Sequence, residues 1–248
     1  MVAANAMQIV NEAIEAHGGM VYWKGLKALD VEMSARGFLF TAKQRPILRH
    51  VRMRAATREP RFTFFDFPKP GQTSELIGNA EVRILDSEGK VVSRREDPRA
   101  AFHGLRRLFK WDDLDFIYFG GYATWNYLTA PFLLNGKGFF IEALEPLQGD
   151  FGQFNRVRVT FPEDVPTHSY EQVFYFDDQR LLRRLDYTAE VVGGWAHAAH
   201  LCEEYRTFGR LKAPTRRWAL PLPFGHKPLP GPRLVDLEVH NITPVPIS

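Results

Sequence analysis

Residues 111–135, WDDLDFIYFGGYATWNYLTAPFLLN, form the stretch around which the rest of the chain is organised. No charged side chain occurs from residue 116 to residue 136. Large residues recur there at spacings of four, four, three and three, which places them along one side of a helix. Further apolar residues cover the flanks, so we expect a helix that is buried on most sides. The stripe itself consists of Leu114, Tyr118, Tyr122, Trp125 and Leu128.

The length of this uncharged run raises the alternative of a membrane span. Two features favour a different interpretation: Gly120 and Gly121 interrupt the helical pattern, and Asn126 and Pro131 dilute the apolar character. The acidic residues at 112, 113 and 115 are typical of a first helical turn, where negative charge meets the positive end of the helix dipole. We therefore expect an aromatic-rich plug or lid within a mostly β structure, and no stable membrane insertion.

The composition excludes some function classes. Hydrophobic residues make up 45% of the 248 residues and charged residues 25%, which is ordinary for a globular protein that can bury a sizeable core. Aromatic residues reach 13%, which is more than a core usually requires. The net charge is +3 and the basic residues are scattered, so we expect no nucleic-acid partner.

The cysteine count and the N-terminal sequence bear on redox state and location. Cys202 is the single cysteine, so an internal disulfide and a cysteine metal cluster are excluded, and a buried apolar role is expected. The N-terminal sequence lacks a basic segment followed by an apolar core, and it lacks a lipobox cysteine. It carries no secretion signal as given, and we expect a cytoplasmic location.

Taken in order, the chain begins with a helix over 5–17, capped by Asn5 and ended by Gly18 and Gly19, and a short connector reaches residue 26. Strand patterns dominate from residue 29, with a hairpin over 81–97. A short helix is expected over 97–109. We predict one α+β domain over 1–248, in which a strongly curved antiparallel half-barrel is closed by the N-terminal helix (1–26) and a mid-chain helical lid (97–135).

The chain resembles the lipoprotein-carrier (LolA/LolB-like) superfamily in its order of elements. The resemblance rests on the HGG sequence at 17–19 followed by Trp23, on the mid-chain helical segment, and on the late strands LLRRLDY (181–187), HLCEEYRTFGRLKAPTRRW (200–218) and VDLEVHNI (235–242). It implies a curved antiparallel half-barrel closed by helices, with acyl chains held in its hollow. Unlike the carriers, this sequence shows no signal peptide or lipid anchor, so the fold carries over better than a periplasmic shuttling role.

The HAAH sequence at 197–200 invites a metal-site interpretation. On a strand, His197 and His200 point to opposite faces, so they cannot share one ion without a bulge. We expect one histidine inside and one outside, and no metal. The sequence also lacks a GxGxxG, a Walker loop and a GxSxG elbow, and we expect no cofactor.

Strand alternation leaves the position of several polar side chains open. In one interpretation the polar faces meet solvent and the aromatic faces meet the hollow. In the other, His168, Arg184, Asp186 and His200 lie together inside and form an acid/base group next to a bound substrate. The sequence does not decide which strand face is concave.

The function that the sequence favours is binding of a hydrophobic or aromatic small molecule, lipid-like or polyketide-like, in the hollow. Arg217 could hold a carboxylate or phosphate head group. The alternative is a cofactor-independent isomerase, cyclase, lyase or hydrolase that uses the His/Asp/Arg group. The sequence does not predict the oligomeric state. The candidate lining residues are Tyr118, Tyr122, Trp125, Phe132, Tyr175 and Tyr187.

Overall fold

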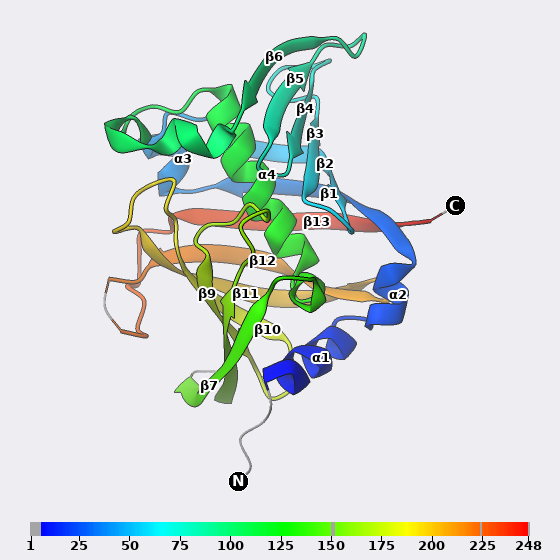
Figure 1. The fold of residues 1–248 in the computed structure, drawn as a ribbon, viewed down its shortest axis with the longest axis vertical. Coiled ribbons are helices and arrows are strands. Elements are labelled where there is room, and N and C mark those ends of the chain that lie inside the picture. Colours follow the sequence, from blue (N-terminus) through cyan, green and yellow to red (C-terminus); the bar gives the residue numbers. More distant parts are fainter. Residues whose placement is uncertain (1–5, 150–151, 224, 248) are drawn as a thin grey trace.

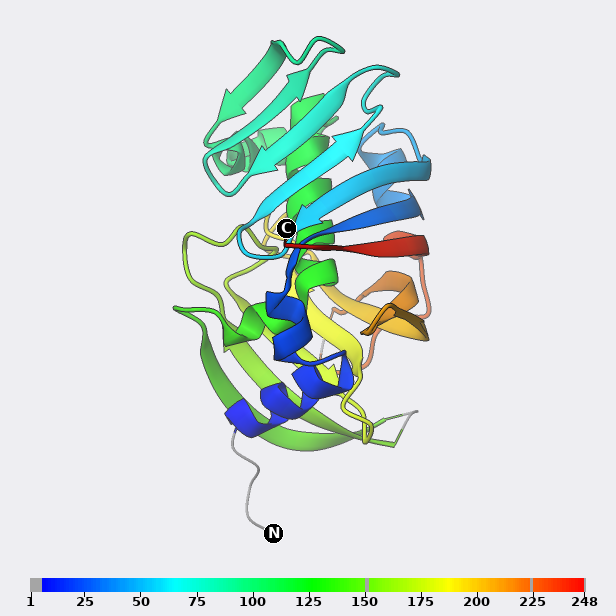
Figure 2. The ribbon, with the colours of Figure 1, turned by 90° about the vertical axis from the view of Figure 1, so that its right-hand side faces the viewer.

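One curved antiparallel sheet surrounds a central helix (Figures 1 and 2). In the computed structural model, which describes residues 6–149, 152–223 and 225–247, the sheet has thirteen strands in the order β6-β5-β4-β3-β2-β1-β13-β12-β11-β10-β9-β8-β7. The strands are β1 Leu26–Arg36, β2 Leu48–Ala56, β3 Arg61–Phe65, β4 Thr73–Ile77, β5 Glu81–Leu85, β6 Val91–Glu96, β7 Phe140–Gly149, β8 Gly152–Thr160, β9 Glu171–Phe176, β10 Leu182–Thr188, β11 His197–Phe208, β12 Leu211–Pro221 and β13 Val235–Pro246.

The first and last strands meet in the middle of the sheet and join its two arms. β1 pairs with β13 along its length, with Val31 opposite Ile242 and Ala35 opposite Leu237. Every other neighbouring pair of strands is consecutive in the sequence, and the edges are β6 and β7. We call β1–β6 the N-terminal arm and β7–β13 the C-terminal arm. The predicted half-barrel is confirmed, since the two edge strands do not pair and the sheet stays open.

Helices occupy the concave face and the ends of the sheet. α1 packs against β7, β8 and the segment after α4 (Figure 2). The short helix expected over 97–109 forms instead as two 3-10 turns, η1 and η2. The helical elements are α1 Ala6–Ala16, α2 Met20–Lys24, α3 Phe38–Ala42, α4 Asp113–Thr129, η1 Pro98–Phe102, η2 Gly104–Leu108 and η3 Phe132–Asn135.

α4 confirms the helix predicted from the aromatic stretch. A capping box joins the side chain of Asp112 to the backbone of Asp115 and the reverse, which satisfies free N–H groups at the helix start. Arg95 donates hydrogen bonds to both carboxylates. Fourteen of the seventeen helical residues are buried, so α4 fills the hollow as a plug and does not lie over its mouth.

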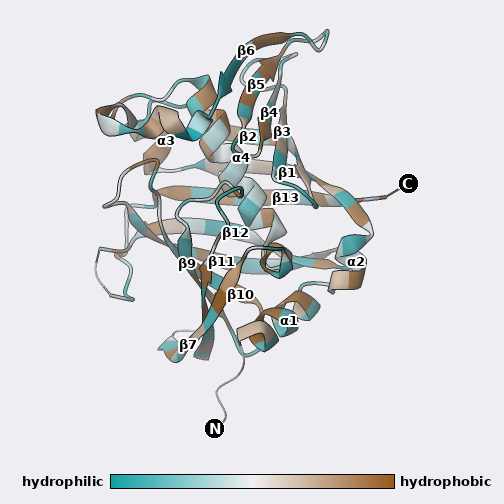
Figure 3. Cartoon of the chain, viewed as in Figure 1, coloured by the Kyte–Doolittle hydropathy of each residue, from teal (hydrophilic) through white to brown (hydrophobic). Residues whose placement is uncertain are grey.

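Gly120 and Gly121 do not interrupt α4. Because they have no side chains, the helix can approach the sheet closely. A Cβ atom on Gly121 would lie 3.1 Å from Cβ of Leu76, and one on Gly120 would lie 3.4 Å from the ring of Phe64. Figure 3 shows α4 as a mixture of hydrophilic and hydrophobic colours. Tyrosine, tryptophan and glycine have low values on the Kyte–Doolittle hydropathy scale, although most of these residues are buried in α4. Within the described residues, no helix is both long and apolar enough to cross a bilayer.

Candidate functional site

A pocket of about 410 Å³ opens beside α4, between α3, the loop of residues 189–196 and the adjoining ends of β12 and β13. Its wall is mainly apolar, and this volume is in the range of small-molecule sites. Among the described residues, its polar members are Lys43, His168, Tyr187 and His197. The apolar lining includes Phe119, Ala189, Val192, Ala198, Ala219 and Val235.

Behind this wall, three tyrosines and two histidines form a buried hydrogen-bonded chain. Tyr122 and Tyr127 come from α4, and their hydroxyl oxygens lie 3.2 Å from Nδ1 and 2.6 Å from Nε2 of His168. The Tyr127 hydroxyl also lies 3.1 Å from that of Tyr187, whose hydroxyl is 3.4 Å from Nδ1 of His200. The rings of His168 and Tyr187 stack with centroids 4.0 Å apart. We call these five residues the Tyr–His chain.

Burial keeps every member of the Tyr–His chain uncharged near neutral pH. Burial lowers the pKa of His168 to about 3, assisted by the nearby Arg99 cation. Burial also lowers the pKa of His200 well below its usual value, with a further contribution from Arg217. The same loss of solvation raises the pKa of Tyr122 well above its usual value. The Tyr–His chain therefore offers neutral hydrogen-bond donors and acceptors and no fixed charge.

The hydrogen bonds of the Tyr–His chain can run in either direction. A neutral imidazole has one N–H donor and one acceptor nitrogen, and each hydroxyl can donate and accept. Reversing the direction changes whether Tyr187 presents a donor or an acceptor without creating a net charge. At the end of the chain, Nε2 of His200 is buried without a hydrogen-bond partner in the described residues.

Arg217 lies in the core near the Tyr–His chain, with 4% of its surface exposed. Its guanidinium donates a 2.7 Å hydrogen bond to the carbonyl of Tyr127, in the last turns of α4, and contacts Sγ of Cys202 at 3.3 Å. A cation at this end of a helix stabilises the free carbonyls and the negative end of the dipole. The geometry thus uses Arg217 to hold α4, whereas the sequence suggested a role in binding a ligand head group.

Asp186 and Arg184 do not join His168 and His200, which corrects the hypothesis of one interior acid/base group. Arg184 donates hydrogen bonds of 2.6 and 2.9 Å to Asp186, and Tyr175 donates one of 2.6 Å. Side chains alternate along a strand, so the inward position of Tyr187 turns its neighbour Asp186 to the convex face. Tyr175 lies there as well, and its pKa rises to about 12 because of burial and the adjacent carboxylate.

The other candidate lining residues are distributed over separate places. Trp125 and Phe132 line a second hollow of about 430 Å³ that also includes Trp23. Tyr118 is fully buried and donates a hydrogen bond to Asn79. Tyr122 belongs to the Tyr–His chain but does not line the 410 Å³ pocket. Of the predicted lining residues, this pocket contains Tyr187.

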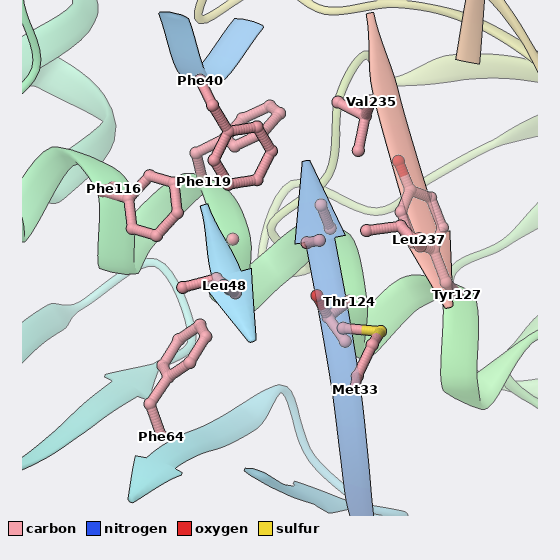
Figure 4. A pocket seen from close by; sticks show the side chains of 13 residues that line it. Met33, Phe40, Leu48, Phe64, Phe116, Phe119, Thr124, Tyr127, Val235 and Leu237 are labelled. Atoms are coloured by element: carbon pink, nitrogen blue, oxygen red, sulfur yellow. The ribbon is translucent and has the colours of Figure 1, made fainter. Parts of the chain in front are cut away.

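A third space lies deeper, between α4 and the middle of the sheet (Figure 4). It measures about 30 Å³, enough for roughly one water molecule. Its wall is almost entirely apolar and includes Met33, Phe64 and Phe116. Phe119 and Val235 line both this cavity and the 410 Å³ pocket, so movement of these two side chains would connect them.

The HAAH histidines lie as the strand pattern predicts. His200 is buried in the Tyr–His chain, whereas His197 is exposed and contacts the hydroxyl of Thr188 at 2.8 Å. The described residues contain no group of three or more His, Cys, Asp or Glu side chains that could hold a metal ion. Cys202 is buried, as expected for a small apolar residue.

Sequence reasoning missed the central role of Tyr127. Its hydroxyl contacts His168 and Tyr187, and its carbonyl accepts from Arg217. The helical stripe selected Tyr118 and Tyr122 because they share one side of α4, and Tyr127 lies on the flank. The available signal was the burial predicted on all sides of this helix, which gives every hydroxyl on it a need for a partner.

Comparison with known proteins locates the fold. No family model and no curated protein matches the sequence. Among solved structures, a LolA superfamily protein from Nitrosomonas europaea matches over 99% of this chain and 96% of its own, with a TM-score of 0.58 and 10% identity. The chain resembles LolA superfamily proteins in fold.

Two further structures support the same assignment of fold. A domain from Vibrio parahaemolyticus, described as an outer membrane lipoprotein-sorting protein, matches over 96% of this chain and 91% of its own, with a TM-score of 0.55 and 10% identity. A DUF1329 family protein from Desulfovibrio piger matches over 96% and 92%, with a TM-score of 0.53 and 10% identity. The predicted resemblance to LolA-like half-barrels is confirmed at the level of fold.

Proposed function

We propose that this protein binds a hydrophobic, lipid-like or aromatic small molecule in the 410 Å³ pocket. The observation that carries the proposal is a wall formed almost wholly by apolar side chains, with two polar residues of the Tyr–His chain, His168 and Tyr187, at its inner side. Burial of the apolar ligand surface would supply most of the binding free energy. The LolA-like fold supports a lipid-like ligand.

The polar part of the ligand is expected to be uncharged, such as a carbonyl or a hydroxyl group. His168 and Tyr187 are neutral at pH 7, and a buried ion without a counter-charge is costly. Lys43 is the lining residue with a formal charge among those described, but its ammonium already lies 5.3 Å from the centre of the Trp111 ring. Burial lowers the pKa of Lys43.

The test is a titration with Nile red, an uncharged fluorescent apolar dye, together with native mass spectrometry of freshly purified protein. Ala196 lines the pocket, and Ala196→Trp should fill part of it and weaken dye binding at least about tenfold, the equivalent of roughly 1.4 kcal/mol. Ala80 is exposed in the turn before β5, so Ala80→Trp is the matched control. Equal affinities of both variants and the wild type would contradict the proposal.

The cytoplasmic location predicted from the sequence is a separate proposal. Fractionation of cells that express the complete native gene product would test it, and recovery of the protein in a periplasmic fraction would contradict it.

A further inference from the structure

Large apolar side chains are exposed to solvent around the mouth of the 410 Å³ pocket. Phe38 and Trp195 line the pocket and are 56% and 69% exposed, and Leu108 lines it at 46%. Next to Leu108, Leu105 and Phe109 are 72% and 66% exposed. Large apolar side chains that are exposed close together mark a surface that binds another molecule or a membrane.

These residues come from segments that are distant in the sequence but meet at one pocket. α3, η2, the loop of residues 189–196 and the segment after β12 all contribute to its wall. Figure 1 shows these segments on one side of the molecule, at its left, and shows α2 on the other side. We call the segments 37–45, 103–113, 189–197, 222–223 and 225–234 the mouth segments.

The excess positive charge of the chain is concentrated in the mouth segments. They contain seven Lys and Arg residues and three Asp and Glu residues, whereas the whole chain contains 32 and 29. The mouth segments therefore carry an excess of four positive charges, and the rest of the chain carries a net negative charge of one. The three acidic residues of these segments, Asp112, Asp113 and Glu190, are each paired with an arginine.

Two of the basic residues in the mouth segments are exposed lysines. Lys110 follows Phe109 directly, and Lys227 lies in the segment after β12. An arrangement of Phe, Leu and Trp side chains with adjacent basic residues is typical of proteins that lie in the interface of a lipid bilayer. Each Lys or Arg near an anionic membrane surface contributes attraction on the order of 1 kcal/mol.

We propose that the mouth segments dock this protein reversibly on an anionic lipid bilayer, with the pocket opening toward the lipid. The exposed apolar residues enter the interfacial layer, and the exposed lysines Lys110 and Lys227 contact the lipid phosphates. Docking in this orientation gives a hydrophobic ligand a path between membrane and pocket that avoids water. The proposal goes beyond ligand binding, since it concerns a surface and not the interior of the pocket.

The test is co-sedimentation of the full chain with vesicles of phosphatidylglycerol and phosphatidylcholine, compared with vesicles of phosphatidylcholine alone. We expect binding to the anionic vesicles, a reduction of at least about tenfold with Phe109→Glu, and a clear reduction at 0.5 M salt. Val21 is 89% exposed on α2, away from the mouth, so Val21→Glu is the control with the same charge change and should bind like the wild type.

Three outcomes would overturn this inference: no sedimentation with anionic vesicles, binding that Phe109→Glu leaves unchanged, or equal losses with Phe109→Glu and Val21→Glu. Concentration-dependent self-association that Phe109→Glu abolishes, without vesicle binding, would also overturn it and would assign the surface to a second copy of the chain. Dye binding in the absence of vesicles reports on the pocket separately, so failure of docking and failure of ligand binding can be told apart.

Discussion

Both arms of the sheet pack on α4, but they present different side chains to it. The N-terminal arm presents mostly apolar residues, among them Phe62, Phe64, Leu76 and Val82, all fully buried. The C-terminal arm presents Tyr187, His200, Cys202 and Arg217, and it borders the 410 Å³ pocket. The N-terminal arm is a mainly packed core that borders a cavity of only about 30 Å³, and the C-terminal arm combines hydrogen bonding with the larger pocket.

The difference shows how one helix can serve two purposes. Against the N-terminal arm, glycines let α4 approach closely, and dense packing maximises dispersion and apolar burial. Against the C-terminal arm, the tyrosine hydroxyls of α4 need polar partners, and the 410 Å³ pocket adjoins this contact. We therefore expect changes in the N-terminal arm to affect stability, and changes in the C-terminal arm to affect stability and ligand binding together.

The largest effect is expected from Phe64→Ala in the N-terminal arm. Phe64 is fully buried and its ring faces Gly120 of α4. Loss of the ring should reduce the free energy of unfolding by about 3–5 kcal/mol, measured by urea denaturation. The folded fraction should keep the dye affinity of the wild type. Weaker dye binding with unchanged stability would contradict the division between the arms.

An intermediate effect is expected from pH, and buried histidines, among them His168 beside the C-terminal arm, should carry it. His168 has a folded-state pKa of about 3, so below pH 6.5 the unfolded state binds a proton that the folded state rejects. Stability from this residue is complete above pH 6.5 and falls as the pH drops toward 3. Between pH 7 and pH 5 the free energy of unfolding that His168 contributes should fall by about 2 kcal/mol.

His168→Gln should therefore reduce the dependence of the unfolding free energy on pH between 7 and 5, and the dependence that remains belongs to other buried histidines such as His200. His197→Gln provides the matched control, since His197 is exposed at the start of β11. Urea denaturation at several pH values measures both slopes. An unchanged slope in His168→Gln would show that the buried histidine is not the group responsible.

The smallest effect is expected from a pair of Tyr→Phe changes on the two faces of the C-terminal arm. Tyr187→Phe removes the hydroxyl between Tyr127 and His200, and Tyr175→Phe removes the hydroxyl that bonds Asp186. Each should cost about 1 kcal/mol of stability. Only Tyr187→Phe should weaken the binding of a ligand that carries a carbonyl or hydroxyl group. Equal effects of both variants on ligand affinity would contradict the assignment of the pocket.

Much of the fold could be predicted, because its signals are local. The uncharged stretch with acidic residues before it specified the buried helix α4, and the turn residues around Gly89 specified the β5–β6 hairpin. The short helix expected over 97–109 was wrong, since this segment forms the two 3-10 turns η1 and η2. A 3-10 turn depends on its neighbours more than on its own residues, which is why this detail was missed.

The candidate site was less predictable, since strand alternation only states which side chains point to opposite faces of the sheet. It correctly separated Tyr187 from Asp186, but it could not say which of them faces the hollow. The pairing of β1 with β13 and the curvature around α4 made the Tyr187 face concave. This placed His168 and His200 beside α4 and turned Asp186 outward with Arg184.

The sequence by itself determined a buried aromatic helix, a mainly antiparallel sheet and one histidine inside at the HAAH segment, because each follows from the spacing of neighbouring residues. Tertiary structure decided the concave face, the assembly of the Tyr–His chain and the pocket bordered by the mouth segments. Those features join residues up to about two hundred positions apart, such as Phe38 and Val235. The physical reason is that closing such distances depends on the pairing and curvature of the whole sheet, which no local pattern encodes.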